Sequence, residues 1–287
     1  MGTPDFAVWS LKRLANKFPI AQVVTNPDRP AGRGMKLTPS PVKAYALAQG
    51  LPVTDDLEAF LRELRTPTGT NNPLFIVVAY GKILPAELVN HYSCINLHAS
   101  LLPKYRGASP IQSALLNGDP VTGVTTMRIT EKMDTGPILL SKEVSISENE
   151  TLQALHDQLA DAGAELLADT IARLNTLTPQ PQDDAHATYC KKIKKEDRLL
   201  DLSWDYRKIH NTVRAIGGYF FDQGKRINIV RTILKPQISV DPPAGTSSRS
   251  AFSELDLLAH YLDIRVKPEG KHEMALGEYL KGRRELS

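Results

Sequence analysis

Short apolar runs alternate with helix-like segments through the first half of the chain. Runs rich in β-branched and apolar residues predict strands at 21–25, 74–80, 94–100, 122–129 and 137–144. Helices are predicted at 40–49, with Pro41 in the first turn, and at 110–116. Strands separated by helices predict an α/β fold, with a Rossmann-like, doubly wound and mostly parallel sheet.

The clearest helical pattern spans residues 151–176. Its leucines and isoleucines recur near one face, and Thr151 is a suitable N-cap. The polar, proline-rich run TPQPQDD follows at 178–184, as expected of a stiff linker. The predicted division is a first domain at 1–177, a linker at 178–190 and a C-terminal domain at 191–287.

The C-terminal domain differs from the rest of the chain in charge. Residues 191–287 contain 19 Lys and Arg against 13 Asp and Glu, whereas the rest of the chain has 16 against 19. The pattern there predicts a helix around 209–216 and a strand at 226–234. A basic domain beside a slightly acidic one indicates an anionic partner, although a solvated surface without a partner would have the same composition.

The bulk composition is that of a globular protein. The 287 residues are 41% hydrophobic and 23% charged, which is enough for two hydrophobic cores. No apolar run approaches the roughly 18 residues of a membrane span, and no secretory signal opens the chain. Cys94 and Cys190 form no CxxC pair, which argues against zinc and suits a reducing cytoplasm.

Two polar side chains interrupt the apolar strand at 94–100. Asn96 and His98 are two residues apart and therefore share a face, at the strand end where open α/β sheets bind ligands. Histidine exchanges protons near neutral pH, and an asparagine N–H can stabilise an oxyanion. Asp134, in the turn sequence MDTG, is the candidate carboxylate to hold the imidazole. A lone histidine or an Asp-Thr-Gly turn is often only structural, so spacing alone leaves both interpretations open.

Two basic segments are candidates for phosphate contact, each with a solvated surface as its alternative. The first, PDRPAGRGMKL at 27–37, contains Arg33 and Lys36 among glycines and prolines. The second contains Lys191, Lys192, Lys194 and Lys195. No GxxxxGK[ST] or GxGxxG motif follows a predicted strand, which argues against nucleotide hydrolysis and dinucleotide binding.

Several long motifs resemble the folate-dependent formyltransferases. They are NLHASLLPKYRGASP, TGVT and MDTGPIL; TNPDRPAGRGMKLTPSPVK and VVAYGKILP are most similar to the branch that acts on methionyl-tRNA. The likeness continues through TYCKKIKKED to the closing KPEGKHEMALGEYLKGRREL and so covers most of the chain. The resemblance implies transfer of a formyl group from 10-formyltetrahydrofolate to the α-amino group of methionine on initiator tRNA. We also expect a cytoplasmic monomer that needs neither a metal nor a membrane.

The resemblance also assigns roles to residues. It implies a catalytic trio of Asn96, His98 and Asp134, the same three that the spacing selects. The folate-contacting positions are Ser100, Leu101, Leu102 and Pro103, with Tyr80 and Gly81 in the segment lining the pterin pocket. The expected tRNA contacts are Arg33, Lys36, Lys191, Lys192, Lys194 and Lys195. In this family residues 1–177 correspond to the catalytic domain and 191–287 to a tRNA-binding domain, a small β-barrel of the oligonucleotide-binding type.

The chain departs from the family pattern at its start. Relatives open with an apolar strand just before GTPDF, whereas here Met1 precedes Gly2 directly, so either the start site is misassigned or the sheet lacks that strand. The segment 241–265 is also abbreviated, which predicts a reduced C-terminal domain. Two alternatives follow: a formyltransferase acting on a glycinamide ribonucleotide or a sugar nucleotide, and a catalytically impaired tRNA-binding paralogue.

Overall fold

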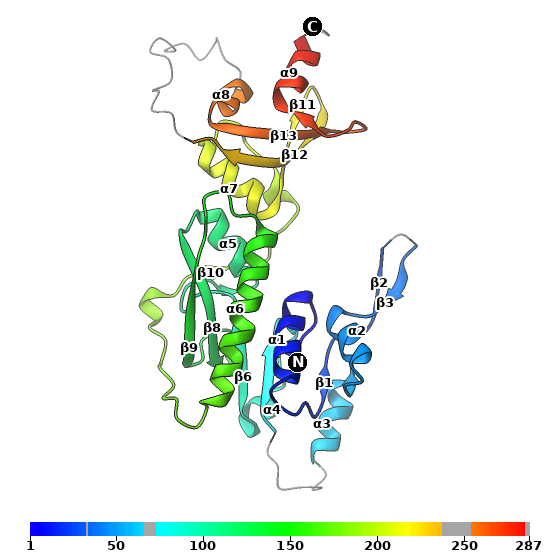
Figure 1. Cartoon of the computed structure of the whole chain (residues 1–287), viewed down its shortest axis with the longest axis vertical. Coiled ribbons are helices and arrows are strands. Elements are labelled where there is room, and N and C mark those ends of the chain that lie inside the picture. The colour runs from blue at the N-terminus through cyan, green and yellow to red at the C-terminus, as the bar shows by residue number, and fades with distance from the viewer. Residues whose placement is uncertain (33, 66–72, 237–253, 285–287) are drawn as a thin grey trace. The chain divides into compact units, whose positions relative to one another are not determined.

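The computed structural model describes residues 1–32, 34–65, 73–236 and 254–284 (Figure 1). The chain divides into two compact units. The first comprises Met1–Pro110, Thr122–Ser145 and His156–Cys190, and the second comprises Ile111–Val121, Ile146–Leu155 and Lys191–Ser287. None of the helices in the described ranges is both long enough and apolar enough to cross a membrane.

The main sheet of the first unit has the strand order β5-β6-β8-β9. These strands are β5 (Phe75–Val78), β6 (Cys94–His98), β8 (Val121–Arg128) and β9 (Ile138–Ser145). β5 and β6 are parallel, but β6 and β8 are antiparallel, so the sheet is mixed and the predicted mostly parallel sheet is wrong. The composition of an apolar strand does not show whether it runs parallel or antiparallel to its neighbour. The direction of β8 is set by the path of the connection from β6 through α5 (Pro110–Asn117).

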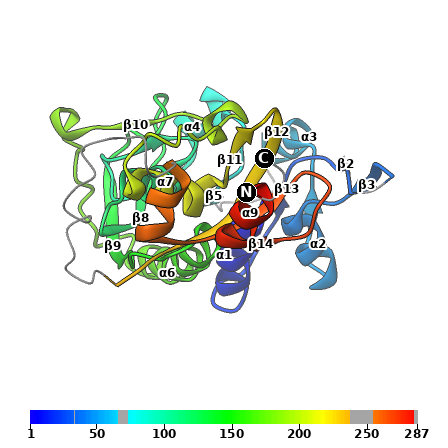
Figure 2. The same ribbon diagram turned by 90° about the horizontal axis from the view of Figure 1, so that it is seen from above.

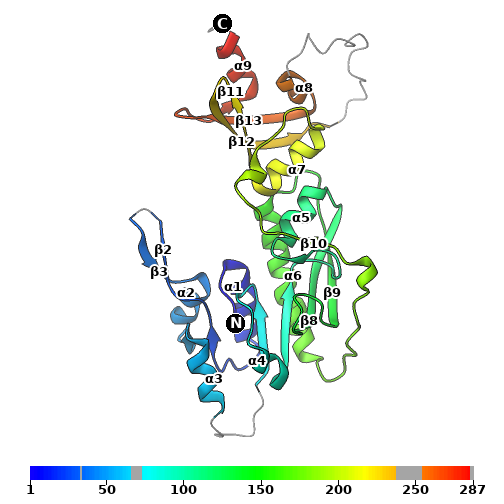
Figure 3. The ribbon, with the colours of Figure 1, turned by 180° about the vertical axis from the view of Figure 1, so that it is seen from behind.

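The predicted helices begin at the capping residues that the sequence indicates. Ser40 Oγ accepts a hydrogen bond from Lys43 N at 3.1 Å, and Pro41 opens α2 (Pro41–Ala48). Thr151 Oγ1 accepts from Ala154 N at 3.3 Å at the start of α6 (Leu152–Ala172). α6 lies alongside β8 (Figures 1 and 3), where the hydroxyls of Thr126 and Thr170 are 2.8 Å apart.

Three further helices of the first unit form in segments for which the sequence pattern predicted no element. They are α1 (Asp5–Ala15), α3 (Leu57–Arg65) and α4 (Ala86–His91). The loop predicted at 27–37 contains a short antiparallel hairpin, β2 (Arg29–Ala31) with β3 (Lys36–Thr38). Side chains of this hairpin are solvent-exposed, including Leu37 at 72%, so no packing pattern marks its strands in the sequence.

A gap separates β1 (Val23–Val24) from β5. β1 pairs with β4 (Val53–Thr54), its Val24 packs with Val77 of β5, and the first two residues of the chain link the two strands through backbone hydrogen bonds. Gly2 N donates to Val24 O at 3.0 Å, while Met1 N donates to Ile76 O at 2.6 Å. Met1 and Gly2 therefore bridge β1 and β5 through their backbone groups.

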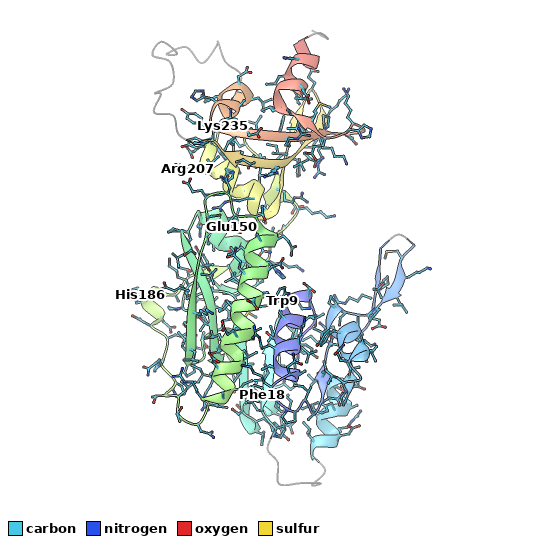
Figure 4. All side chains as sticks on the ribbon, in the orientation of Figure 1. Trp9, Phe18, Glu150, His186, Arg207 and Lys235 are labelled. Carbon is cyan, nitrogen blue, oxygen red and sulfur yellow. The ribbon has the colours of Figure 1, made fainter. Side chains whose placement is uncertain are left out.

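An apolar cavity of about 330 Å³ continues this gap. Leu14, Val23, Ile76 and Phe18 are among its lining residues, and Phe18 is labelled in Figure 4. These apolar side chains therefore face the cavity. Cavities of this kind cost stability because their lining atoms have fewer dispersion partners than a packed core provides.

Residues 178–190, which the sequence predicts to be a linker, are hydrogen-bonded into the first unit. Gln180 and Ile138 exchange two backbone hydrogen bonds, each 2.8 Å long. β10 (Tyr189–Cys190) pairs in parallel with β7 (Arg106–Gly107). Prolines alternate with glutamines in TPQPQ, so every second backbone N–H and both carboxamides remain available for bonding.

The second unit is built on an antiparallel sheet with the order β11-β12-β13-β14. Its strands are β11 (Gly218–Asp222), β12 (Lys225–Leu234), β13 (Leu262–Pro268) and β14 (Met274–Ala275), and its helices are α7 (Tyr206–Ile216), α8 (Glu254–Tyr261) and α9 (Leu276–Arg284) (Figure 2). Ile209 of α7, Phe220 of β11 and Val266 of β13 share one buried core. Over the ranges that the structure describes, no strand pair closes this sheet, so the β-barrel stays a prediction.

A buried histidine joins α7 to this sheet. His210 is 1% exposed, its Nε2 donates to Glu148 O at 2.9 Å, and its Nδ1 accepts from Thr232 Oγ1 at 2.9 Å. Burial lowers the pKa of His210. His210 is thus a buried, hydrogen-bonded core residue of the second unit.

Candidate functional site

β6 carries Asn96 and His98 to the carboxyl edge of the main sheet. Val78 at the end of β5 pairs with Leu97, so the residues that follow these two parallel strands lie at the same edge. His98 is buried at 7% exposure, and Asn96 is half-buried. Two neighbouring strand ends at one sheet edge form the usual ligand position of an open α/β sheet.

The imidazole of His98 lies between a carbonyl and a carboxylate. Its Nε2 is 2.9 Å from Tyr105 O, and because a carbonyl only accepts, Nε2 must carry a hydrogen. Its Nδ1 is 3.8 Å from Asp134 Oδ1. The structure therefore brings together the two residues that the sequence selected 36 positions apart, and it leaves Nδ1 as the ring nitrogen able to exchange a proton.

The Asp134 carboxylate is held by the backbone next to the histidine's own partner. Gly107 N donates to Asp134 Oδ2 at 2.9 Å, and the carboxylate is only 13% exposed. Asp134 has φ +54°, in the left-handed region that Asp tolerates better than most residues. Gly136 packs against Arg128 O so closely that a Cβ would not fit. The MDTG sequence thus forms the turn and also supplies the carboxylate of the site.

The predicted folate segment forms a tight turn after β6. Ser100 is fully buried, and its hydroxyl donates to Lys104 O at 2.6 Å. Thr125 Oγ1 donates to Ser100 O at 2.7 Å and accepts from Leu102 N at 3.2 Å. The Ser100 hydroxyl hydrogen is therefore used within the protein. Leu101 and Pro103, both half-buried, are the members of the segment with more surface to offer a ligand.

Tyr80 and Gly81 follow β5 at the same sheet edge. The Tyr80 ring is 2% exposed and packs with Val24 and Val77. Burial also raises the pKa of its phenol. Asn26 Nδ2 donates to Tyr80 O at 2.9 Å, and Gly81 has φ +78°. The backbone of Tyr80 thus lies at this sheet edge, whereas its ring is packed in the core.

Sequence reasoning missed a side-chain network that supports the Asp134 turn. Gln182 Nε2 donates to Asp134 O at 2.9 Å and to Gly136 O at 2.7 Å. Gln182 Oε1 accepts from Arg106 Nε at 3.0 Å and from Arg106 Nη2 at 2.8 Å. The only sequence signal was the position of Arg106 in the KYRG segment. Nothing local distinguishes Gln182 within a run that looks like a linker.

The predicted tRNA contacts lie in both units. Arg33 falls outside the described residues, whereas Lys36 is exposed on β3 of the first unit. The predicted lysines of the second unit are all exposed: Lys191, Lys192, Lys194 and Lys195. None of these described lysines forms an ion pair within the residues that the structure places, so their charges are available to an anionic partner.

This arrangement can bind a ligand at a sheet edge and exchange a proton with it through His98. No group of three or more His, Cys, Asp and Glu is arranged to hold a metal ion within the described ranges. A family model for the formyl transferases matches residues 6–171, and one for the formyl transferase C-terminal domain matches residues 192–284. The chain belongs to the formyl transferase family.

Curated relatives match nearly the whole chain. The methionyl-tRNA formyltransferase of Caldanaerobacter subterraneus subsp. tengcongensis is 40% identical over 297 residues, covering 98% of this chain and 95% of the relative. The methionyl-tRNA formyltransferase of Thermodesulfovibrio yellowstonii is 41% identical over 298 residues, covering 99% and 94%. These alignments run through both units.

Solved structures share the fold at lower identity. The N-formyltransferase from Helicobacter canadensis, solved with folinic acid and dTDP-3-aminofucose, has a TM-score of 0.59 and 23% identity, covering 82% of this chain and 87% of that chain. The methionyl-tRNA formyltransferase from Clostridium thermocellum has a TM-score of 0.52 and 16% identity, covering 79% and 91%. At these identities the likeness concerns the fold.

Proposed function

We propose that this enzyme transfers a formyl group from 10-formyltetrahydrofolate to the α-amino group of methionine on initiator tRNA, giving formylmethionyl-tRNA for translation initiation. The observation that carries the proposal is the pairing of His98 with Asp134, with Nδ1 3.8 Å from Oδ1, at the end of β6. The near full-length identity of about 40% to methionyl-tRNA formyltransferases supports this choice of substrate.

The first chemical step is attack of the methionine α-amine on the formyl carbon. It forms a C–N bond and places negative charge on the formyl oxygen. The Asn96 side chain, which shares a face of β6 with His98, supplies an N–H donor for that oxyanion. A donor of this kind contributes about 3 kcal/mol to transition-state stabilisation.

Proton transfer accompanies the step and balances it. The attacking amine loses one proton, and N10 of the folate gains one as its bond to the formyl carbon breaks. Nε2 of His98 is committed to Tyr105 O, so Nδ1 is the atom that takes up and returns the proton. Asp134 Oδ1 faces Nδ1 and stabilises the imidazolium while it lasts. Holding both reactants at one sheet edge supplies much of the remaining acceleration.

We propose that different residues bind the two substrates. For the folate we propose Leu101, Pro103 and the backbone around Gly81, in line with the folinic acid bound by the H. canadensis protein.

For the tRNA we propose phosphate contacts on both units. Arg33, Lys36 and the lysines at 191–195 would orient the RNA without reading its sequence. We further propose that residues 191–287 act as the tRNA-binding domain with an oligonucleotide-binding barrel. The catalytic domain then corresponds to 1–177, and the enzyme works in the cytoplasm as a monomer.

A formyl-transfer assay with competing acceptors tests the proposal. Methionyl-tRNA, a glycinamide ribonucleotide and a dTDP-amino sugar are offered separately with saturating 10-formyltetrahydrofolate. We expect transfer to methionyl-tRNA, and a loss of about 10²- to 10⁴-fold in His98→Ala. His186→Ala is the matched control, because His186 is 79% exposed and is labelled in Figure 4 on a segment away from β6. Preference for another acceptor, or no transfer at all, contradicts the proposal.

A further inference from the structure

The Asp134 turn is held from two sides by neighbouring residues of one segment. Gly107 N binds the carboxylate of Asp134, and the adjacent Arg106 side chain binds Gln182. Gln182 in turn binds the carbonyl oxygens of Asp134 and Gly136. Residues 106–107, Gln182 and the turn therefore form a closed ring of contacts around the carboxylate.

Every polar atom of the Gln182 carboxamide has a partner, and the partners fix its orientation. Its nitrogen donates to two carbonyl oxygens, at 2.9 and 2.7 Å, and its oxygen accepts from two guanidinium N–H groups. A flipped amide would set an oxygen against two acceptors and a donor against a cation. Glutamine is therefore the one common side chain of this length that satisfies both sides.

Arg106 gives this ring a rigid base. Its side chain is 2% exposed, and Nη2 also binds Asp184 Oδ1 at 2.8 Å. A buried guanidinium with fixed partners presents a planar pair of N–H groups that a lysine does not reproduce. The segment 182–184 is thereby tied to the same residues that flank Tyr105, the acceptor for His98.

We propose that Gln182 and Arg106 are positioning residues that hold the Asp134 carboxylate against His98 Nδ1. This inference rests on the proposed formyl transfer. The turn has a left-handed φ of +54° at Asp134, a conformation with little intrinsic preference for a non-glycine residue. Without Gln182 the Asp134 and Gly136 carbonyls lose their side-chain donor, the turn loosens, and the distance of the carboxylate from Nδ1 widens although the Gly107 contact remains. Gln182 does not touch the reacting atoms.

The test compares Gln182→Met with Gln180→Met in the full-length enzyme. Methionine keeps the side-chain length and removes the polar contacts, whereas the exposed Gln180 side chain bonds only Thr178 O at 3.2 Å in the described structure. We expect Gln182→Met to lower kcat about 10- to 100-fold with both KM values near wild type, and Gln180→Met to leave both unchanged. Gln182→Glu, which sets a carboxylate oxygen against two carbonyls, should be at least as impaired.

A double-mutant cycle asks whether Gln182 acts through Asp134. In an Asp134→Asn background, Gln182→Met should lower kcat little further, because the carboxylate that it positions is already absent. The same fold-loss in both backgrounds would mean that Gln182 acts independently and would overturn the proposal, as would wild-type kcat in Gln182→Met.

An NMR readout separates this proposal from the proposed function. Wild-type protein that formylates no acceptor contradicts the function, yet the Gly107 amide proton still reports its bond to Asp134 Oδ2. In protein labelled with ¹⁵N-glycine, Gln182→Met should shift this resonance upfield and speed its exchange, whereas Gln180→Met should not. An unchanged Gly107 resonance in folded Gln182→Met overturns the positioning role even without activity.

Discussion

The amino group of Met1 should make the stability of the first unit depend on pH. In a preparation that begins at Met1, this amine is buried beside the cavity between β1 and β5, although the Met1 residue as a whole is only partly buried. It donates to Ile76 O at 2.6 Å, and no carboxylate is within ion-pair distance in the described structure. Burial lowers its pKa from 8.0 to about 5.

The direction and size of the effect follow from this shift. Between pH 5 and pH 8 the unfolded chain binds a proton that the folded chain rejects, so stability rises with pH across this window. At about 1.4 kcal/mol per pKa unit, a shift from 8.0 to about 5 corresponds to about 4 kcal/mol. That is a large share of the 5–15 kcal/mol by which proteins are typically stable.

N-terminal acetylation is the perturbation that isolates this amine. The acetyl group removes the titration, keeps an N–H for Ile76 O, and fits in the cavity of about 330 Å³. Free and acetylated proteins share all other titrating groups, including the buried His210 of the second unit, whose pKa is also lowered. We therefore expect the free-amine protein to lose about 3 kcal/mol relative to the acetylated protein between pH 8 and pH 5, because each pH is the midpoint of one titration.

Urea denaturation of a single-tryptophan protein measures this difference in the first unit alone. The chain has two tryptophans, so Trp204→Phe leaves Trp9 of α1 as the fluorescent reporter. Unfolding free energies are extrapolated to water at pH 5, 6.5 and 8, after intact-mass confirmation that Met1 is present. Equal pH slopes in the free and acetylated proteins would refute the reasoning.

Two further perturbations test surface charge and packing. Lys191→Gln with Lys195→Gln should reduce the slope of log tRNA affinity against log salt by about 1 for each phosphate interaction removed, as measured by filter binding; an unchanged slope would remove these lysines from the interface. Gly163→Ala would bring a Cβ within 2.8 Å of Leu97 Cδ2 and should destabilise the first unit by about 1–3 kcal/mol in thermal or urea unfolding. Gly282→Ala in α9 meets open space and should instead stabilise the second unit by up to about 1 kcal/mol, so equal effects of the two substitutions would contradict the packing argument.

Local sequence signals predicted the elements that carry the site. The strand at 94–100 and the helix at 40–49 appear as β6 and α2, the latter with Pro41 in its first turn as predicted. The pairing of His98 with Asp134 also follows from residue type and turn chemistry, because strand ends and the turns between neighbouring strands collect at sheet edges. These signals are local, since periodicity and capping depend on a few consecutive residues.

The sequence by itself determined the strand at 94–100, the helices at 40–49 and 151–176, and which polar side chains reach the carboxyl edge of the sheet. Only the tertiary structure decided that β8 runs antiparallel to β6, that β1 and β5 are separated by a cavity, and that Gln182 supports the Asp134 turn. The physical reason is the range of the interactions. Gln182 and Arg106 are 76 residues apart, and their bond, like the direction of a strand, depends on where the folded chain returns.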